Sequence, residues 1–265
     1  MPGQEPVADP DLVARLRAAG CVFAEEEAEL ILSTARTPGE VAIMAERRIS
    51  GQPLEHVLGW AEFCGLRLVV EPGVFVPRPR TAFLIGQAVA LARALPGTPV
   101  VLDLCCGTGA MGAALAAGVE RPVELHAADL DPAAVRCARR NLPGAHVHEG
   151  DLYEPLPAAL RGRVDLLIAS PPYVPSDSVG LLPPEARLYE PLTALDGGGD
   201  GLDVVRRVIA GAPGWLAPGG HLLVETSERQ AAATALAAER AGLTARVTGS
   251  DDLDATAVIA TAPHH

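Results

Sequence analysis

Four consecutive residues, Ser170-Pro171-Pro172-Tyr173, combine types that can hold a planar polar group. The prolines fix φ and lack an N–H, so the carbonyls beside them keep fixed directions. Tyr173 adds a flat ring that can stack on a planar group. An amide or exocyclic amine whose two N–H groups meet fixed acceptors would have its nitrogen lone pair aimed in one direction. The motif therefore predicts Ser170, Pro171, Pro172 and Tyr173 as catalytic residues, and the alternative is a proline turn with a packing tyrosine.

A second group of chemically informative residues lies at the end of the apolar run from Val100 to Leu104 and in the turn that follows it. Asp103 lies near the end of that run, and Gly107 and Gly109 bracket a tight turn before an alanine-rich stretch that favours a helix. Strand, glycine turn and helix form a cradle in which the backbone can approach a ligand closely. The dinucleotide pattern G-x-G-x-x-G is incomplete, because Cys105 stands where its first glycine would be. The alternative is a turn that only packs a helix on a sheet.

The order of an acidic residue, three residues and Gly-x-Gly resembles motif I of class I S-adenosylmethionine-dependent methyltransferases. In doubly wound sheets an acidic residue about 20 positions past the glycine turn accepts the ribose hydroxyls, and Asp129 stands 20 residues after Gly109. Asp151 follows the next predicted strand, where this fold places the adenine contact. The expected cofactor is therefore S-adenosylmethionine, and its expected contacts are Asp103, Cys105, Cys106, Gly107, Thr108, Gly109, Asp129, Asp151, Leu152 and Ser170.

Composition narrows the class of protein. The chain has 265 residues, 49% of them hydrophobic, and a formal net charge of -12, which disfavours a nucleic-acid partner because such binding relies on clustered Lys and Arg. The five cysteines lack paired metal-ligand spacing and are expected to be free thiols, with no metal. Because no secretory signal and no apolar run of bilayer length is present, we expect a cytoplasmic protein without a membrane partner.

The remaining elements must position these residues. Residues 1–62 have helical stripes and helix-start signals and are expected to form a small helical domain. Residues 63–81 alternate apolar and polar types, are interrupted at Glu71-Pro72-Gly73, and are expected to form a hairpin linker that ends in a Pro-Arg-Pro turn. From 82 to 265, strands and helices alternate, which predicts an α/β fold with the motifs at the carboxyl edge of a doubly wound sheet.

Taken together, these motifs resemble the protein-(glutamine-N5) methyltransferases that modify peptide release factors. The resemblance covers nearly the whole chain, and its carriers are Pro53–Gly59 with Phe63, Pro77-Arg78-Pro79, Asp103–Gly109, Asp129, Pro171-Pro172-Tyr173, Tyr189-Glu190-Pro191 with Ala194-Leu195, Gly219-Gly220 and Leu223–Glu225. It implies methyl transfer to a glutamine side chain in a protein, a substrate-docking helical domain, and a seven-stranded Rossmann-like sheet with a reversed last strand. It also implies substrate contacts from Arg78 and Glu190 alongside the Ser-Pro-Pro-Tyr motif.

Two departures from that family keep other functions open. Ser170 replaces an asparagine, and Arg80 and Ala82 replace an acidic pair. Ser-Pro-Pro-Tyr is also the motif of DNA methyltransferases that act on the N4 amine of cytosine, so a nucleobase-amine methyltransferase is one alternative. A cofactor-binding relative that has lost turnover is another.

Overall fold

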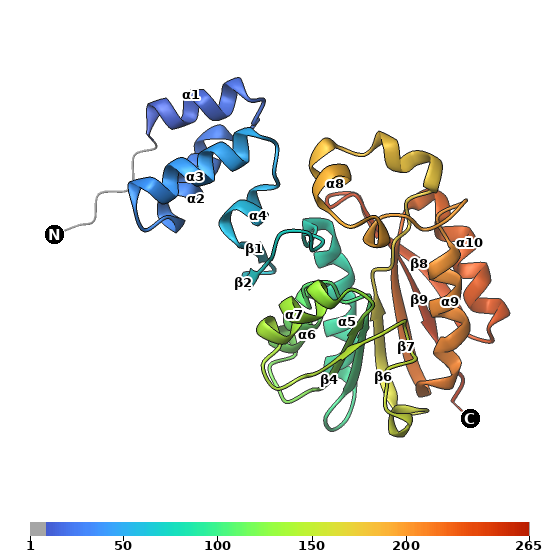
Figure 1. Ribbon diagram of the computed structural model, residues 1–265. Coiled ribbons are helices and arrows are strands. Elements are labelled where there is room, and N and C mark those ends of the chain that lie inside the picture. The colour runs from blue at the N-terminus through green and yellow to red at the C-terminus, as the bar shows by residue number, and fades with distance from the viewer. Residues whose placement is uncertain (1–8, 265) are drawn as a thin grey trace.

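The computed structural model describes residues 9–264, in which a small group of helices stands beside a larger sheet domain (Figure 1). The N-terminal helices are α1 (Pro10–Ala18), α2 (Ala24–Thr34), α3 (Pro38–Ile49) and α4 (Leu54–Leu58). Asp9 caps α1 by accepting from the Asp11 N–H at 3.0 Å, and Thr37 caps α3 by accepting from the Glu40 N–H at 3.1 Å. Both helices therefore begin at a side-chain N-cap that is followed by a proline.

The linker is a hairpin, but its turn is not where the sequence pattern put it. The strands are β1 (Trp60–Phe63) and β2 (Leu66–Val69), so the prediction of the turn at Glu71–Gly73 is wrong. Cys64 and Gly65 form the two-residue turn, with φ of 50° and 76°. Two successive positive φ values suit the right-handed twist of the flanking strands. The following residues, Val70, Val74 and Val76, are buried without forming a strand, which explains their apolar pattern.

The sheet has seven strands in the order β5-β4-β3-β6-β7-β9-β8, and it confirms the class I methyltransferase fold. The strands are β3 (Val100–Leu104), β4 (Glu124–Asp129), β5 (His146–Glu149), β6 (Val164–Ala169), β7 (Leu216–Thr226), β8 (Thr244–Ser250) and β9 (Ala255–Thr261). β3 to β7 are parallel, whereas β9 runs antiparallel to both β7 and β8. The reversed last strand is therefore confirmed.

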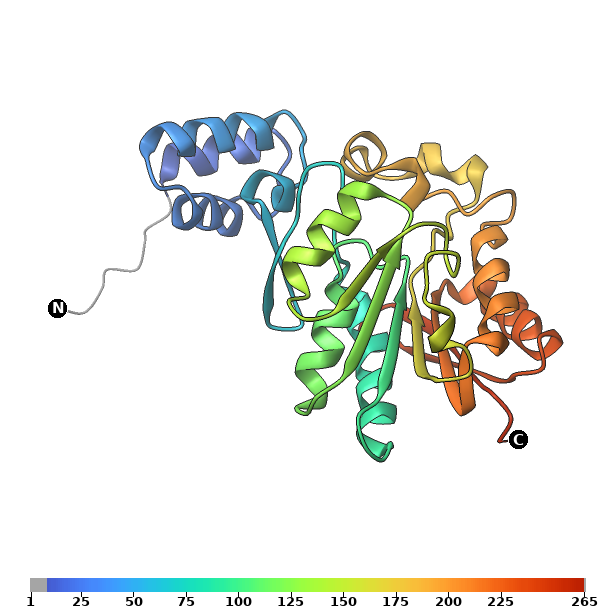
Figure 2. The same ribbon diagram turned by 60° about the horizontal axis from the view of Figure 1, so that its bottom comes forward.

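Helices cover both faces of this sheet (Figure 2). One core joins Val101, Leu166 and Ile168 to residues of α5 (Ala82–Ala94), α6 (Ala110–Val119) and α7 (Pro132–Asn141). The other joins Leu102 and Leu104 to residues of α9 (Asp203–Gly211) and α10 (Glu228–Arg240). Because alternate residues of a strand face opposite sides, one buried strand contributes to both cores.

A long connection between β6 and α9 joins the two parts of the molecule. It holds short 3-10 turns and helix α8 (Pro184–Tyr189), none of which the sequence analysis predicted. Arg48 of α3 is buried, with its guanidinium 2.6 Å from Glu27 in its own domain and 2.5 Å from Glu185 of α8. Tyr189 adds a hydrogen bond to the Ser50 carbonyl at 3.2 Å. The N-terminal helices are therefore fastened to the segment that follows the Ser-Pro-Pro-Tyr motif.

None of the helices within residues 9–264 is both long enough and apolar enough to span a bilayer.

Candidate active site

The glycine turn after β3 has a backbone that only small or strained residues can adopt. Gly107 and Gly109 have φ of 54° and 77°, and Cys105 also lies in the left-handed region at 54°. A Cβ at Gly109 would stand 2.8 Å from a Leu142 methyl and 3.3 Å from the Ala138 backbone. A Cβ at Gly107 would meet nothing within 4 Å. The turn is thus packed tightly against α7 behind Gly109 and open in front of Gly107.

Asp103 lies behind this turn. It is fully buried, and one carboxylate oxygen accepts from the Gly112 N–H at 2.9 Å, which caps the start of α6. Its Oδ1 has no hydrogen-bond partner among the residues that the structure describes. Burial raises the pKa of this carboxyl to about 8, although the Gly112 N–H opposes the shift. Neither Asp103 nor Gly109 lines the adjoining cavity, so both shape the turn from behind.

A cavity opens in front of the turn at the carboxyl edge of the sheet. It brings together most of the residues expected to contact a cofactor, namely Cys105, Cys106, Gly107, Thr108, Asp129, Asp151, Leu152 and Ser170. Asp129 ends β4, and its two carboxylate oxygens accept from the Gly107 N–H at 2.8 Å and the Asp131 N–H at 2.9 Å. Each oxygen keeps lone-pair capacity for a further donor. Burial raises the pKa of Asp129, and the backbone N–H groups oppose this.

An ion pair holds another part of the wall of this cavity. Asp151 lies 2.6 Å from a guanidinium nitrogen of Arg207, a residue of α9 that lines the same cavity. Leu152 has a φ of 49° and contributes an apolar wall. Sequence reasoning missed Arg207, and its only signal was its place on an amphipathic helix.

A second cavity lies on the other side of the Ser-Pro-Pro-Tyr motif. Pro171, Tyr173, Arg80, Glu190 and Glu225 line it, together with Pro53 and Glu55 from the N-terminal helices and several residues of the long connection. Four residues line both cavities: Phe75, Arg78, Ser170 and Ala194. The two spaces therefore meet at Ser170, which follows directly on β6.

Tyr173 belongs to a polar network at the base of the second cavity. Its hydroxyl donates to Glu225 at 3.2 Å and accepts from Arg80 at 2.6 Å, while the Thr81 hydroxyl donates to Glu225 at 2.5 Å. Burial, followed by the nearby Glu225 carboxylate, raises the pKa of Tyr173 to about 12. The phenol is thus held protonated and in a fixed orientation. Only the position of Glu225 near the carboxyl end of a strand could have indicated this role.

Glu190 holds the Pro-Arg-Pro turn. One carboxylate oxygen lies 2.5 Å from the Arg78 guanidinium, and the other accepts from the Val76 N–H at 3.1 Å. The Glu190 side chain is 1% exposed, so it is a buried anchor. Arg78 also lies over the Phe75 ring, 4.6 Å from its centroid. Arg78, which lines both cavities, is therefore held by a residue from a distant segment of the chain.

Comparisons with known proteins place this geometry in context. The family model described as "Methyltransferase small domain" matches residues 66–181. A release factor glutamine methyltransferase from Geobacter sulfurreducens is 41% identical over 192 residues, covering 71% of this chain and 65% of the relative. The protein of that name from Cereibacter sphaeroides is 38% identical over 267 residues, covering 91% of this chain and 92% of the relative.

The matched segment thus spans slightly less than two thirds of the Geobacter relative and nearly all of the Cereibacter relative. Among solved structures, a methyltransferase from Pyrococcus furiosus matches with a TM-score of 0.54 and 18% identity, covering 75% of this chain and 90% of that one. That likeness supports the fold of the sheet domain.

Proposed function

This chain belongs to the release factor glutamine methyltransferase family, and from that membership we propose that it transfers a methyl group from S-adenosylmethionine to the side-chain amide nitrogen of a glutamine in a peptide chain release factor. The observation that carries the proposal is the meeting of two cavities at Ser170. One cavity has the residues for a nucleoside-bearing cofactor. The other opens toward the N-terminal helices and can admit a side chain of a protein.

The first cavity fits S-adenosylmethionine. The Asp129 carboxylate is already oriented by two backbone N–H groups and keeps lone pairs for the ribose hydroxyls. The open space in front of Gly107 allows close approach to the backbone, and Leu152 offers an apolar surface to the adenine. When bound, the cofactor supplies an electrophilic methyl group on a sulfonium.

The Ser-Pro-Pro-Tyr motif would hold the acceptor amide. Among residues 9–264, no protein donor meets the Pro171 carbonyl, which leaves it available to an N–H of the substrate. The Ser170 hydroxyl is the second acceptor, directly or through a water that compensates for its short reach. An amide nitrogen is a weak nucleophile, so orientation must supply the catalysis, and holding a near-attack geometry can contribute about 7–11 kcal/mol. Tyr173 presents its fixed ring to the amide plane.

The N-terminal helices would dock the protein around that glutamine. Pro53 and Glu55 line the second cavity, which we call the acceptor cavity. Arg48 joins α3 to Glu185, which lines the same cavity. We therefore propose residues 1–62 as the substrate-docking domain, with Arg78 and Glu190 fixing the turn beneath it. All five cysteines are free thiols, which supports the cytoplasm as the compartment.

Glu185→Gln should raise KM for the release factor about two- to fivefold while the dissociation constant of S-adenosylmethionine stays unchanged. The substitution removes the charge that Arg48 meets at 2.5 Å and loosens one wall of the acceptor cavity. The effect is small because Glu185 is half exposed and such pairs contribute at most about 1 kcal/mol. Steady-state kinetics and calorimetry measure the two constants. The exposed Asp177→Asn in the same connection is the control, and an unchanged KM in both variants would contradict the docking role.

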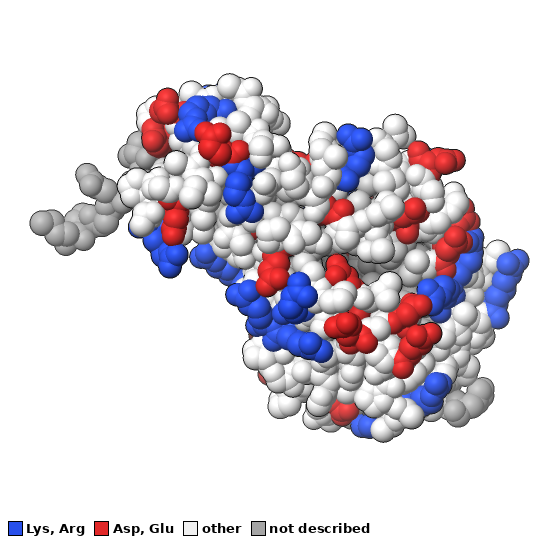
Figure 3. Space-filling model, in the orientation of Figure 1, with Lys and Arg blue, Asp and Glu red and all other residues white. Residues whose placement is uncertain are grey.

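The proposed acceptor is tested by incubating the chain with radiolabelled S-adenosylmethionine and separate pools of host protein and host DNA. We expect label in a release factor and none in DNA. Figure 3 shows basic side chains gathered on the part of the sheet domain next to the N-terminal helices, but the formal net charge of -12 gives little support for binding a phosphate backbone. Label in DNA would favour the nucleobase-amine alternative, and bound cofactor without label in either pool would favour a relative without turnover.

A further inference from the structure

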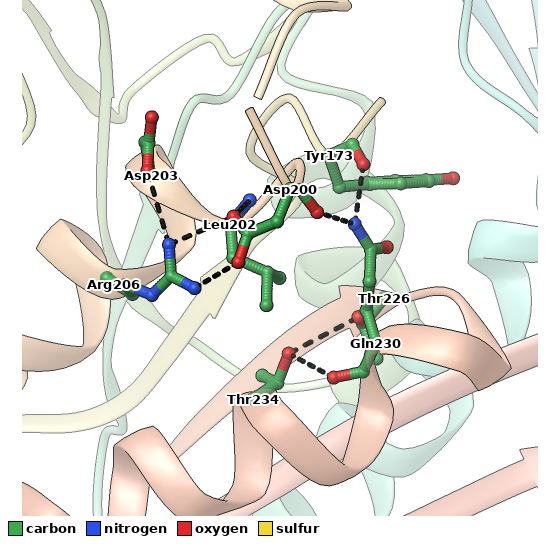
Figure 4. Close-up of polar contacts among 8 residues, drawn as sticks. All are labelled: Tyr173, Asp200, Leu202, Asp203, Arg206, Thr226, Gln230 and Thr234. Carbon is green, nitrogen blue, oxygen red and sulfur yellow. Dashed lines mark hydrogen bonds and ion pairs between the residues drawn. The ribbon is translucent and has the colours of Figure 1, made fainter. Parts of the chain in front are cut away.

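The backbone that follows the proline pair is held by a side chain from a distant helix. Gln230 of α10 donates from its amide nitrogen to the Tyr173 carbonyl at 2.9 Å and to the Asp200 carbonyl at 3.0 Å. An amide nitrogen has two hydrogens, so one side chain can satisfy both carbonyls at once. Figure 4 shows the Gln230 amide nitrogen meeting both carbonyl oxygens, with the Tyr173 ring extending away from Asp200.

The glycine-rich segment from Asp196 to Gly201 packs directly on this backbone. A Cβ at Gly201, where φ is 78°, would lie 2.3 Å from the Tyr173 carbonyl oxygen and 2.4 Å from the Gln230 amide nitrogen. A Cβ at Gly197 would lie 2.7 Å from the Pro172 carbonyl oxygen. Only glycine permits such an approach, since real Cβ atoms are not found this close to backbone.

Further hydrogen bonds fix the segment in the same place. Val174 donates to the Leu195 carbonyl at 3.0 Å, and its own carbonyl accepts from the Gly197 N–H at 2.8 Å. Asp200 is held in turn by Leu202 and Arg206, whose contacts with it are drawn in Figure 4. The carbonyls of Tyr173 and Val174 are therefore both occupied, and the peptide planes that follow Pro171 cannot rotate freely.

We propose that Gln230 and Gly201 form a clamp that positions the acceptor motif, with Gln230 as a positioning residue that acts through the Tyr173 backbone. Rotation of the Tyr173 peptide would move its ring and would re-aim the Pro171 carbonyl, both of which the proposed function assigns to the acceptor amide. The proposal rests on that function. Neither clamp residue lines the cofactor cavity, so the clamp acts on turnover and not on cofactor affinity.

Gln230→Ala should lower kcat for release-factor methylation about five- to tenfold, because the half-buried Tyr173 carbonyl and the exposed Asp200 carbonyl lose their shared donor and the motif loses its fixed orientation. The dissociation constant of S-adenosylmethionine should stay within twofold. Arg229→Ala, at the exposed neighbouring position on α10, is the matched control and should keep wild-type kinetics. Equal kcat in Gln230→Ala and the control contradicts the clamp.

Gln230→Glu separates positioning from general destabilisation through its pH profile. The carboxylate would face two carbonyl oxygens, and this repulsion raises its pKa above the usual value of about 4.3. Protonation restores one donated hydrogen bond. The kcat of this variant relative to the wild type should therefore recover as pH falls from 8 to 6, whereas that of Gln230→Ala should stay flat. Parallel profiles in the two variants contradict the assignment.

Gly201→Ala and Gly199→Ala test the close approach without changing Gln230. Gly199 lies in the same segment, but a Cβ there would meet nothing within 4 Å, so only Gly201→Ala should lower kcat. Hydrogen exchange gives a readout without turnover: amides of residues 174–201 should exchange faster in Gln230→Ala than in the wild type, with β3 to β5 unchanged. Unchanged exchange there contradicts the clamp, whereas a wild-type chain that does not methylate a release factor contradicts the proposed function.

Discussion

Ser170→Ala should slow turnover roughly 5- to 150-fold, with the affinity for S-adenosylmethionine nearly unchanged. Ser170 lies where the two cavities meet, and its hydroxyl is one of two acceptors that we assign to the glutamine amide. A buried N–H left without an acceptor costs about 1–3 kcal/mol, which sets the range. Single-turnover kinetics with saturating cofactor isolate the affected step. Ser178→Ala, in the long connection away from the first cavity, is the matched control.

The companion variant Ser170→Asn tests what the serine replaces. If the serine is a variant of the family asparagine, the longer amide places its oxygen closer to the substrate and turnover should be kept or raised. Loss of all release-factor methylation in Ser170→Asn would instead mean that the cavity is shaped around serine, which favours another acceptor. Wild-type turnover in both Ser170 variants would contradict the proposed mechanism at this residue.

Asp129→Ala should weaken binding of S-adenosylmethionine at least tenfold. Its carboxylate ends β4 inside the first cavity, and charge-assisted hydrogen bonds from the ribose hydroxyls contribute on the order of 1.5–3 kcal/mol each. Isothermal calorimetry measures the affinity. Asp129→Asn keeps the shape of the side chain, removes the charge and should weaken binding less.

Glu149→Ala is the control for that measurement, because Glu149 pairs with Asp129 on the neighbouring strand but is exposed and lies outside the cavity. A thermal melt of each variant shows whether the Gly107 turn stays folded without its acceptor. A folded Asp129→Ala variant with wild-type affinity would rule out the ribose assignment.

The buried strands were predictable because their residues are apolar on both faces. Val100–Leu104 and Val164–Ala169 are uninterrupted apolar runs apart from Asp103 and Asp165, and the alternation with helices fixes the parallel order. The glycine turn and the place of Asp129 at a strand end could also be predicted, since backbone conformation and strand ends depend on the local sequence. Their shared cavity follows from the topology, because carboxyl ends of parallel strands meet at one edge.

The contacts that close the site could not be predicted from the sequence, since they join residues far apart in the chain. Arg78 meets Glu190 112 residues later, and Arg48 meets Glu185 137 residues later. The burial of Asp103 depends on how α6 packs above it, which the motif alone does not specify. The hairpin turn was misplaced because Pro72-Gly73 is a stronger local turn signal than Cys64-Gly65, whose conformation depends on the strand pairing.

The central claim is methyl transfer to a glutamine side chain, and it is tested most directly by tandem mass spectrometry of a purified, unmethylated release factor incubated with this chain and S-adenosylmethionine. We expect a mass increase of about 14 Da, one methyl in place of one hydrogen, on a glutamine, with fragment ions that place the methyl on its side-chain nitrogen. Ser170→Ala should give the same product, but less of it in the same short time under single-turnover conditions. A release factor that stays unmodified with the wild-type chain, or a methyl group on any residue other than glutamine, would contradict the claim.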